Sequence, residues 1–460
     1  MLRRLVTLSS PPALAVALIL DGYGQMSGHW LSLLRPVIVS AAVATVLTLV
    51  LLAITRRMTL ASAVGVAVVC FLFGQQGLFA IALLGIATAL AWMWWLCVSR
   101  RPQPSVSPIV VGLPVIALLA VVLASRIADG SLALGDPVGL PRTAVPPTSS
   151  GGTNVYVLLL DGYPRADDLE AEWGFDNGRF LSELASLDFD VDPDSRSPFQ
   201  ETSLTLAASM LQDTRPLRQW RPSDFQAEVQ MRRDVRRQYL GNTPVMDRYR
   251  SADYRLVYIA SPVAHTDWFG WDVRLDSGNV TDVETLLIQR SPLRFVLGDW
   301  VMDQHRARLD ASLVAWADQG SVGGRQVVFA HVMAPHPPFL YGPHGAERSP
   351  LPCWFSLECN IYHHRAVDLD ISVSDYDQLL LPHLQELNKK VLGAIRELVA
   401  IDPQAAIVVF SDHGARYSES RSEEWYHSLF AARLPSDLRM TDLRAAGLFA
   451  TILRALDGRP

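Results

Sequence analysis

The apolar residues of this 460-residue chain are concentrated before residue 127. A transmembrane helix needs about 20 predominantly apolar residues, and several runs approach that length. The sequence therefore predicts five membrane spans, at residues 5–23, 36–55, 59–77, 79–98 and 107–125. The first run is the weakest, because its apolar stretch is short and contains Pro11 and Pro12.

Three arginine pairs predict the orientation of these spans, at residues 3–4, 56–57 and 100–101. With five spans and a cytoplasmic N-terminus, all three pairs lie in the cytoplasm, as the positive-inside rule requires. Everything after residue 127 then lies outside, and it stays outside even if the first run does not span. None of the runs carries a mid-membrane charge that would mark a transport pathway, so residues 1–127 are predicted to be an anchor.

The rest of the chain has the composition of a water-exposed protein. Residues 128–152 are rich in Pro, Gly and Ser and are predicted to be a linker to a domain at 153–460. The net charge of −6 and the lack of a long basic run argue against a nucleic-acid partner. Two cysteines in the apolar runs, Cys70 and Cys97, are interpreted as buried thiols. Outside the cytoplasm, a disulfide between Cys353 and Cys359 is plausible.

Four short apolar, β-branched runs alternate with helical patterns in this domain. Continuous apolar strands belong in a sheet that is covered on both faces, and the expected strands are residues 154–160, 255–261, 326–332 and 405–411. Residues 382–399 are predicted to form one amphipathic helix, with Pro382 in its first turn. The fold class is therefore α/β with a mostly parallel sheet.

Acidic and histidine residues follow three of these strands. In a parallel sheet, ligands bind at the carboxyl ends of the strands. The first strand ends at Asp161, the fourth ends at Asp412 and His413, and the third ends near His331 and His336. Two carboxylates and one imidazole suit a divalent cation such as zinc or manganese. A lone Asp-Gly is often only turn chemistry, so the combination carries the prediction.

A nucleophile is expected in residues 197–211, which are predicted to be a loop that runs into a helix. Thr202 falls at the start of this helix, where backbone N–H groups favour an anion such as phosphate. A metal ion on its oxygen would make an alkoxide available. The alternative, that Thr202 is only an N-cap, is equally compatible with the sequence.

The chain resembles the sulfatase-like branch of the alkaline phosphatase superfamily, and in particular lipoteichoic acid synthases and phosphoethanolamine transferases. The motifs that carry the resemblance are VYVLLLDGYPR at 155–165, QETSLTLAASML at 200–211, HVMAPHPPFLY at 331–341 and VVFSDHGAR at 408–416. They stand in the order of that family. The resemblance implies an N-terminal transmembrane part of about five helices and an extracytoplasmic α/β/α catalytic domain, in a bacterial-type cytoplasmic membrane.

The resemblance also implies roles for individual residues. Asp161, Thr202, Asp412 and His413 would hold one divalent metal ion, manganese or zinc, with magnesium as an alternative. Thr202 would be the nucleophile. His336 would bind the phosphoryl oxygens, and His331 would either orient the site and contact substrate or be a satisfied core histidine.

Two departures from the family narrow this expectation. The Cys/Ser-x-Pro-x-Arg motif that sulfatases convert to formylglycine is absent from the sequence, so a threonine nucleophile points to phosphoryl chemistry. A second metal set cannot be assigned, and the remaining histidines are more readily interpreted as surface residues: His363, His364 and His427.

These observations predict a membrane-anchored phosphotransferase. It would move a phospho-head group from a phospholipid or other phosphate-ester donor to a cell-envelope acceptor, such as a glycan, through a phospho-threonine intermediate. A metal-dependent phosphodiesterase, phosphatase or other sulfatase-like hydrolase that uses water is one alternative, and a non-catalytic envelope scaffold is another.

Overall fold

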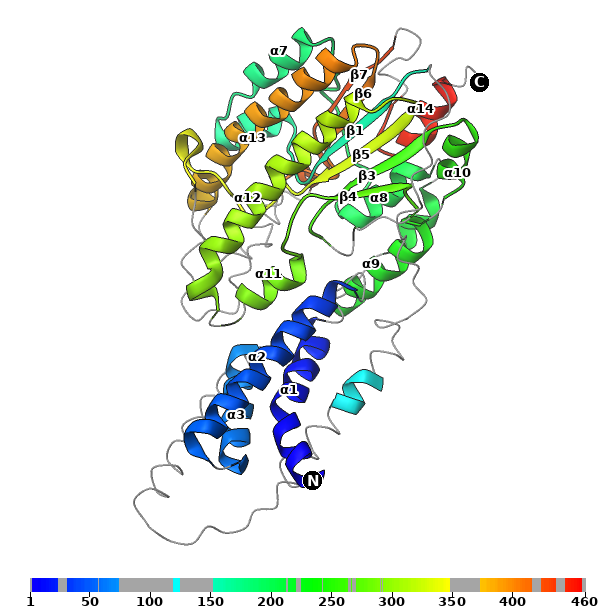
Figure 1. Cartoon of the computed structure of the whole chain (residues 1–460). Coiled ribbons are helices and arrows are strands. Elements are labelled where there is room, and N and C mark those ends of the chain that lie inside the picture. The colour runs from blue at the N-terminus through cyan, green and yellow to red at the C-terminus, as the bar shows by residue number, and fades with distance from the viewer. Residues whose placement is uncertain are drawn as a thin grey trace. The chain divides into compact units, whose positions relative to one another are not determined.

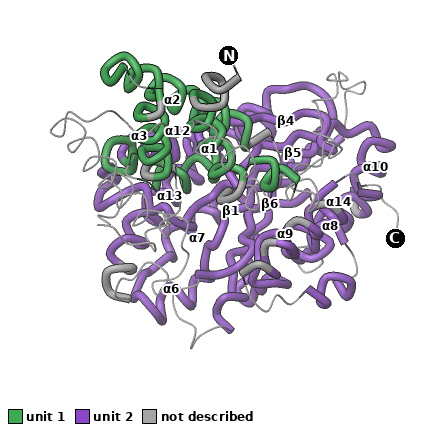
Figure 2. The backbone as a smooth tube through the Cα atoms, turned by 90° about the horizontal axis from the view of Figure 1, so that it is seen from below, with its two compact units in different colours: residues 1–136, 281–298 green, residues 137–280, 299–460 purple. Residues whose placement is uncertain are grey.

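The computed structural model of the chain forms two compact units, which Figure 2 colours separately. Unit 1 comprises residues 1–136 and 281–298, and unit 2 comprises residues 137–280 and 299–460. The structure describes residues 2–23, 31–56, 58–73, 119–124, 152–211, 214–220, 225–241, 243–263, 266, 270–289, 291, 293–347, 373–415, 423–435 and 443–456.

Unit 1 contains three apolar helices near the N-terminus, α1 (Leu2–Tyr23), α2 (Leu31–Thr55) and α3 (Met58–Phe73). α1 packs against both others, and Ser10 Oγ lies 2.8 Å from Ser62 Oγ between α1 and α3. Small and hydroxyl residues at such contacts are typical of helices packed in lipid. The same unit contains α11 (Asp282–Gln289) and the start of α12 (Arg294–Asp318).

One helix in the described part of the chain is long and apolar enough to cross a membrane, at Leu33–Thr55 within α2. Many of its apolar side chains are exposed, including Ile38, Val46 and Ile54, as expected of a helix that faces lipid. The shorter apolar stretches Leu8–Leu20 and Leu60–Cys70 lie in the helices beside it. The expected span at 79–98 and most of that at 107–125 lie outside the described residues, so the count of five spans stays a prediction.

Unit 2 is built around a mixed, mostly parallel seven-stranded sheet in the order β2-β7-β6-β1-β5-β3-β4 (Figure 1). The four predicted strands are confirmed as β1 (Val155–Leu160), β3 (Arg255–Ala260), β5 (Gln326–Val332) and β6 (Ala406–Phe410). β1 pairs in parallel with β5 and β6, and β3 pairs in parallel with β5 and β4 (Val273–Asp276). β7 (Phe430–Arg433) and β2 (Asp190–Val191) extend the β6 edge in antiparallel fashion.

Helices cover both faces of this sheet. Successive side chains of β1 point to opposite faces and therefore enter two separate hydrophobic cores. Val155, Val157 and Leu159 face one core, whose helices are α8 (Thr202–Met210), α9 (Phe225–Tyr239), α10 (Pro244–Ser251) and α14 (Leu448–Leu456). Tyr156 and Leu158 face the other core, whose helices are α6 (Ala166–Trp173), α7 (Gly178–Ser186), α12 and α13 (Val373–Ile401). The expected α/β/α layering is therefore present.

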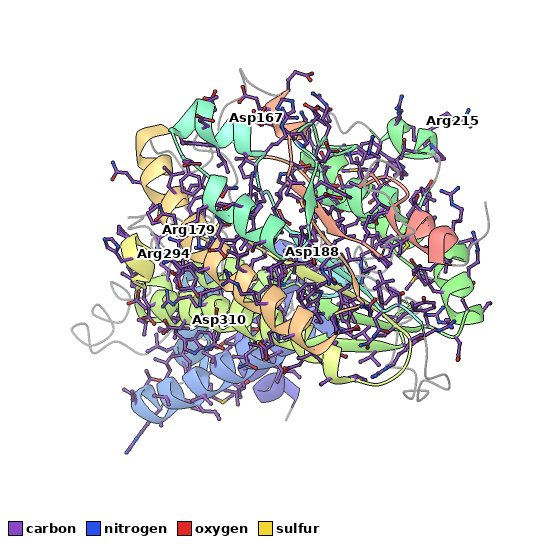
Figure 3. All side chains as sticks on the ribbon, turned by 90° about the horizontal axis from the view of Figure 1, so that it is seen from above. Asp167, Arg179, Asp188, Arg215, Arg294 and Asp310 are labelled. Carbon is purple, nitrogen blue, oxygen red and sulfur yellow. The ribbon has the colours of Figure 1, made fainter. Side chains whose placement is uncertain are left out.

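An ion pair ties together the two long helices of the second face. Asp310 of α12, labelled in Figure 3, lies 2.8 Å from Lys390 Nζ of α13. The short 3₁₀ turns lie at Arg215–Gln219, Gln319–Ser321, Pro343–Gly345 and Glu424–Tyr426.

One helix boundary predicted from sequence is wrong. α13 begins at Val373 and not at Pro382, so Pro382 lies inside the helix and not in its first turn. Proline lacks the N–H that would bond to the carbonyl four residues earlier, but the packing of the following residues, such as Leu384 and Leu387, buries the helix against the sheet.

Candidate metal and phosphoryl-transfer site

Asp161 stands at the carboxyl end of the central strand β1. Its N–H still bonds to Val332 O of β5 at 3.0 Å, so the residue is held in register with the sheet. Gly162 then turns the chain with φ +72°, a conformation that favours glycine. A Cβ on Gly162 would lie 3.3 Å from the His413 ring and 3.8 Å from His336 Cβ, so both histidines pack against this turn.

Asp412 and His413 follow the neighbouring strand β6. Ser411 fixes this segment, because its hydroxyl accepts from Tyr163 N–H (2.7 Å) and donates to His413 O (2.7 Å). The N–H of Gly162 donates to Asp412 Oδ1 at 3.0 Å. The chain is irregular here, and adjacent Asp412 and His413 side chains can therefore serve the same site.

Asp161, Asp412 and His413 converge in one buried cluster. One ligand atom from each lies within 4.8 Å of the others. His413 Nε2 lies 3.5 Å from Asp161 Oδ1 and 3.3 Å from Asp412 Oδ2. The three side chains are at most 2% exposed, so both carboxylates are almost fully removed from water.

The chemistry of this cluster fits a divalent cation. Asp161 Oδ1 and Asp412 Oδ2 are buried and accept no hydrogen bond within the described part of the chain, which is costly unless a cation satisfies them. His413 Nδ1 lies 2.7 Å from Gly414 O. A carbonyl can only accept, so the proton sits on Nδ1 and the lone pair of Nε2 points at the carboxylates. The residues thus supply two oxygens and one nitrogen, as zinc or manganese prefers.

His331 supports this cluster from within β5. Its Nε2 lies 2.9 Å from Asp161 Oδ2, and its Nδ1 lies 3.5 Å from Thr266 Oγ1. Burial raises the pKa of Asp161, but the nearby His336, His331 and His413 outweigh that effect and bring the pKa below its ordinary value. Asp161 is therefore an anion at neutral pH. The contact between His331 and Asp161 favours the interpretation that His331 orients the site over the interpretation that it is a core histidine.

His336 lies beside the same carboxylate. Its N–H donates to Asp161 O at 2.9 Å, and its Nδ1 lies 2.7 Å from Pro337 O. That carbonyl accepts the Nδ1 proton, which sets the tautomer of the His336 ring. A protonated His336 can donate from Nε2 to a phosphoryl oxygen.

Thr202 is the first residue of α8, as expected, but the N-cap alternative is wrong. Glu201 is the N-cap, and its side chain accepts from Leu204 N–H at 3.0 Å. The half-buried Thr202 hydroxyl is not used for capping. One turn later, Thr205 Oγ1 donates to Asp412 O at 3.1 Å. Residues three apart share a helix face. The start of α8 is therefore fixed against the loop that carries Asp412 and His413, here called the metal-ligand loop.

A second polar network next to this loop was missed by sequence reasoning. His427 Nδ1 lies 3.1 Å from both carboxylate oxygens of Asp168, and Arg196 Nη1 lies 2.9 Å from His427 Nε2. His427 is thus half-buried and hydrogen-bonded, and is not a surface residue as expected. Asp168 and His427 are 259 positions apart, and no local pattern in the sequence links them. The residues His363 and His364 lie outside the described part of the chain, as do Cys97, Cys353 and Cys359.

Comparison with solved structures gives the following similarities. The lipooligosaccharide phosphoethanolamine transferase EptA of Neisseria meningitidis is 13% identical, with a TM-score of 0.38, and the match covers 83% of this chain and 69% of that one. The periplasmic domain of Escherichia coli EptC in complex with Zn is 14% identical, with a TM-score of 0.34, covering 65% and 81%. A 2-O GAG sulfatase is 13% identical, with a TM-score of 0.39, covering 67% and 71%.

The chain is thus similar to a phosphoethanolamine transferase and to a sulfatase, the two kinds of protein named by the sequence-based resemblance. Neither a protein-family model nor a curated protein sequence matches the chain. At these identities and TM-scores the neighbours assign no role to any residue of this chain.

Proposed function

We propose that this protein is a membrane-anchored, metal-dependent phosphotransferase that moves a phospho-head group from a lipid-type donor to an envelope acceptor. One observation carries the proposal. A buried cluster of Asp161, Asp412 and His413 lies at the sheet edge to which Thr205 ties the helix that starts with Thr202. A cation site and a hydroxyl at a helix N-terminus together suit phosphoryl transfer.

Asp161, Asp412 and His413 would hold the metal ion, with the Thr202 hydroxyl as a further ligand. When bound, a divalent cation lowers the pKa of a coordinated hydroxyl and neutralises charge on a phosphoryl group. His331 acts through Asp161, because the 2.9 Å contact fixes the orientation of that carboxylate.

The first turn of α8 can receive the phosphoryl oxygens. Glu201 already satisfies two amides of this turn, since its side chain accepts from Leu204 N–H and its carbonyl from Thr205 N–H. The amides of Thr202 and Ser203 have no such partner among the described residues, which leaves them to bind an anion. His336, when protonated, donates to another phosphoryl oxygen.

Thr202 Oγ attacks phosphorus, a P–O bond to Thr202 forms, and the bond to the lipid alcohol breaks. The alcohol leaves with a proton. In the second half, an acceptor hydroxyl attacks the phospho-threonine, the P–O bond to Thr202 breaks, and the proton of the acceptor hydroxyl goes to Thr202 Oγ. If water is the acceptor, the same steps give hydrolysis, so the acceptor decides between transferase and phosphodiesterase.

The test uses the full chain in lipid nanodiscs that contain phosphatidylethanolamine or phosphatidylglycerol. We expect peptide mass spectrometry to find a head-group phosphate on Thr202. Thr202→Ala should lower turnover by about a thousandfold or more, whereas Thr202→Ser should retain part of it. Normal turnover in Thr202→Ala would refute the proposal. Product analysis with and without a glycan acceptor separates transfer from hydrolysis.

A further inference from the structure

The first two turns of α12 carry an exposed apolar patch that the proposed chemistry does not use. Phe295 is 53% exposed, Val296 is 80% exposed and Trp300 is 45% exposed. Val296 and Trp300 are four residues apart and therefore share one helix face. The Arg294 guanidinium carbon lies 4.9 Å from the centre of the Phe295 ring, and Figure 3 labels Arg294 on this helix. We call these four residues the α12 patch.

The segment that leads into the patch belongs to the unit that contains the membrane helices. Residues 281–298 cluster with residues 1–136 although the sheet of unit 2 precedes and follows them in the sequence. The α11 side chains Val283, Leu286 and Leu287 are buried, and α11 contacts α2. Its start is a capping box, in which Glu284 Oε2 accepts from Thr281 N–H at 2.9 Å and Glu284 N–H donates to Thr281 Oγ1 at 3.3 Å.

The same glutamate attaches α11 to the membrane-spanning helix. Arg35 donates through Nε and Nη2 to the two carboxylate oxygens of Glu284. Such a bidentate ion pair fixes the orientation of the two side chains as well as their proximity. Arg35 lies at the start of α2, two residues into the stretch that is long enough to cross a membrane. α11 is therefore at the level where that span meets water, on the outer side in the orientation predicted from the arginine pairs.

We propose that the α12 patch is a membrane-interfacial contact, seated in the phospholipid head-group layer beside the outer end of α2. Tryptophan and phenylalanine with a neighbouring arginine are the side chains enriched at this level of a bilayer. The arginine complements the lipid phosphates, and the aromatic rings enter the boundary with the acyl chains. Asp299, exposed between Val296 and Trp300, limits the contact to a shallow one.

This contact is independent of the proposed reaction, because none of its residues belongs to the metal site. Through this contact, the start of α12, which comes after β1 to β4 in the sequence, returns to the lipid surface. The catalytic unit is then linked to the bilayer by more than the linker at 128–152. The partner is the lipid surface itself, and another protein surface at the patch is a competing outcome of the test.

The experiment places a photoreactive benzophenone amino acid at Val296 in the full chain, in nanodiscs of phosphatidylethanolamine and phosphatidylglycerol. The matched control carries the same group at Val314, which is 54% exposed and lies on the same helix. After irradiation, we expect at least fivefold more phospholipid adduct at Val296 than at Val314, measured by intact mass. A benzophenone at Phe295, closer in shape to the native ring, gives the same readout if the Val296 variant folds poorly.

Equal lipid labelling at the two positions would overturn the proposal. Crosslinks from Val296 to a peptide of this chain or of a second copy, in place of lipid, would overturn it as well. Loss of turnover by Thr202→Ala bears only on the proposed function, so the two proposals can fail separately.

Discussion

The hydroxyl of Thr205 donates a hydrogen bond to the carbonyl oxygen of Asp412 at 3.1 Å, and also lies 3.3 Å from Phe199 O. This contact joins the helix that begins with Thr202 to the loop that carries Asp412 and His413, two of the proposed metal ligands. The position of the proposed nucleophile relative to the candidate cation site therefore depends on a side chain that belongs to neither.

Replacing Thr205 with valine should separate positioning from metal binding. The change keeps the size of the side chain but leaves the buried carbonyl of Asp412 without its donor, at a cost of about 1–3 kcal/mol. We expect kcat to fall by about tenfold, which corresponds to about 1.4 kcal/mol, with metal content unchanged. Thr205→Ser keeps the hydroxyl and should recover most of the activity. Wild-type kcat in Thr205→Val would show that this bond does not position Thr202.

Replacing Asp412 with asparagine should have opposite effects on stability with and without metal. Asp161 and Asp412 are two buried carboxylates that face one imidazole nitrogen, so removing one charge relieves repulsion in the apo protein. With metal at 100 times its dissociation constant, the wild type gains about 2.7 kcal/mol by linkage, and the variant loses that gain.

The measurement for Asp412→Asn is metal content together with thermal unfolding, with chelator and with manganese or zinc. Asp310→Asn, which removes an acid that pairs with Lys390 on the surface of the same unit, serves as the control and should bind metal normally. Metal binding by Asp412→Asn at wild-type stoichiometry and affinity would contradict the assignment of this carboxylate as a ligand.

The extent to which the site could be predicted follows from what the sequence encodes locally. Asp161 and Asp412 each follow a strongly patterned strand, so the sheet-edge rule was sufficient to group them. The helix that starts with Thr202 was predicted separately, from the loop that runs into it. The capping residue was not predictable in the same way, because a threonine at the helix start is a more typical N-cap than Glu201.

Contacts between residues that are far apart in the sequence could not be predicted from local sequence patterns. The bond from His331 to Asp161 depends on β5 lying next to β1 in a register that pairs Leu159 with His331. The remaining strands β2, β4 and β7 have only 2–4 residues each, too few for a clear pattern in the sequence. Their strand geometry comes from neighbours in the sheet, and tertiary context decides such segments more than propensity does.

Two glycine substitutions should change stability in opposite directions. A Cβ at Gly414 would lie 2.5 Å from the carbonyl oxygens of both Glu424 and His427, which are backbone atoms and cannot rotate away. Gly414→Ala should therefore destabilise the protein by about 1–3 kcal/mol and disturb the metal-ligand loop. Gly393 is exposed inside α13 with no atom within 4 Å of its Cβ position, so Gly393→Ala should stabilise by about 0.5–1 kcal/mol. Urea unfolding of both variants gives the comparison, and equal shifts would contradict the close approach at Gly414.

His305 should make the folded state sensitive to acid. Burial, with a smaller contribution from the charge of Arg308, lowers the pKa of this α12 side chain to about 3. An unfolded histidine titrates near pH 6.5, so below that pH the unfolded state binds a proton that the folded state excludes, and stability falls as pH falls. Between pH 6.5 and 4.5 the loss from this one group is about 2.3 kcal/mol.

His305→Gln removes the titration and keeps a polar side chain of similar size. We expect its free energy of unfolding to depend less on pH than that of the wild type between pH 6.5 and 4.5, by that amount, in urea unfolding of the detergent-solubilised chain. His344→Gln is the matched control, because His344 is exposed, and it should follow the wild-type curve. A weaker pH dependence of unfolding in His305→Gln than in His344→Gln would show that the folded protein excludes the charged form of His305. Identical pH profiles of the two variants would mean that the folded protein protonates His305 as readily as the unfolded chain does.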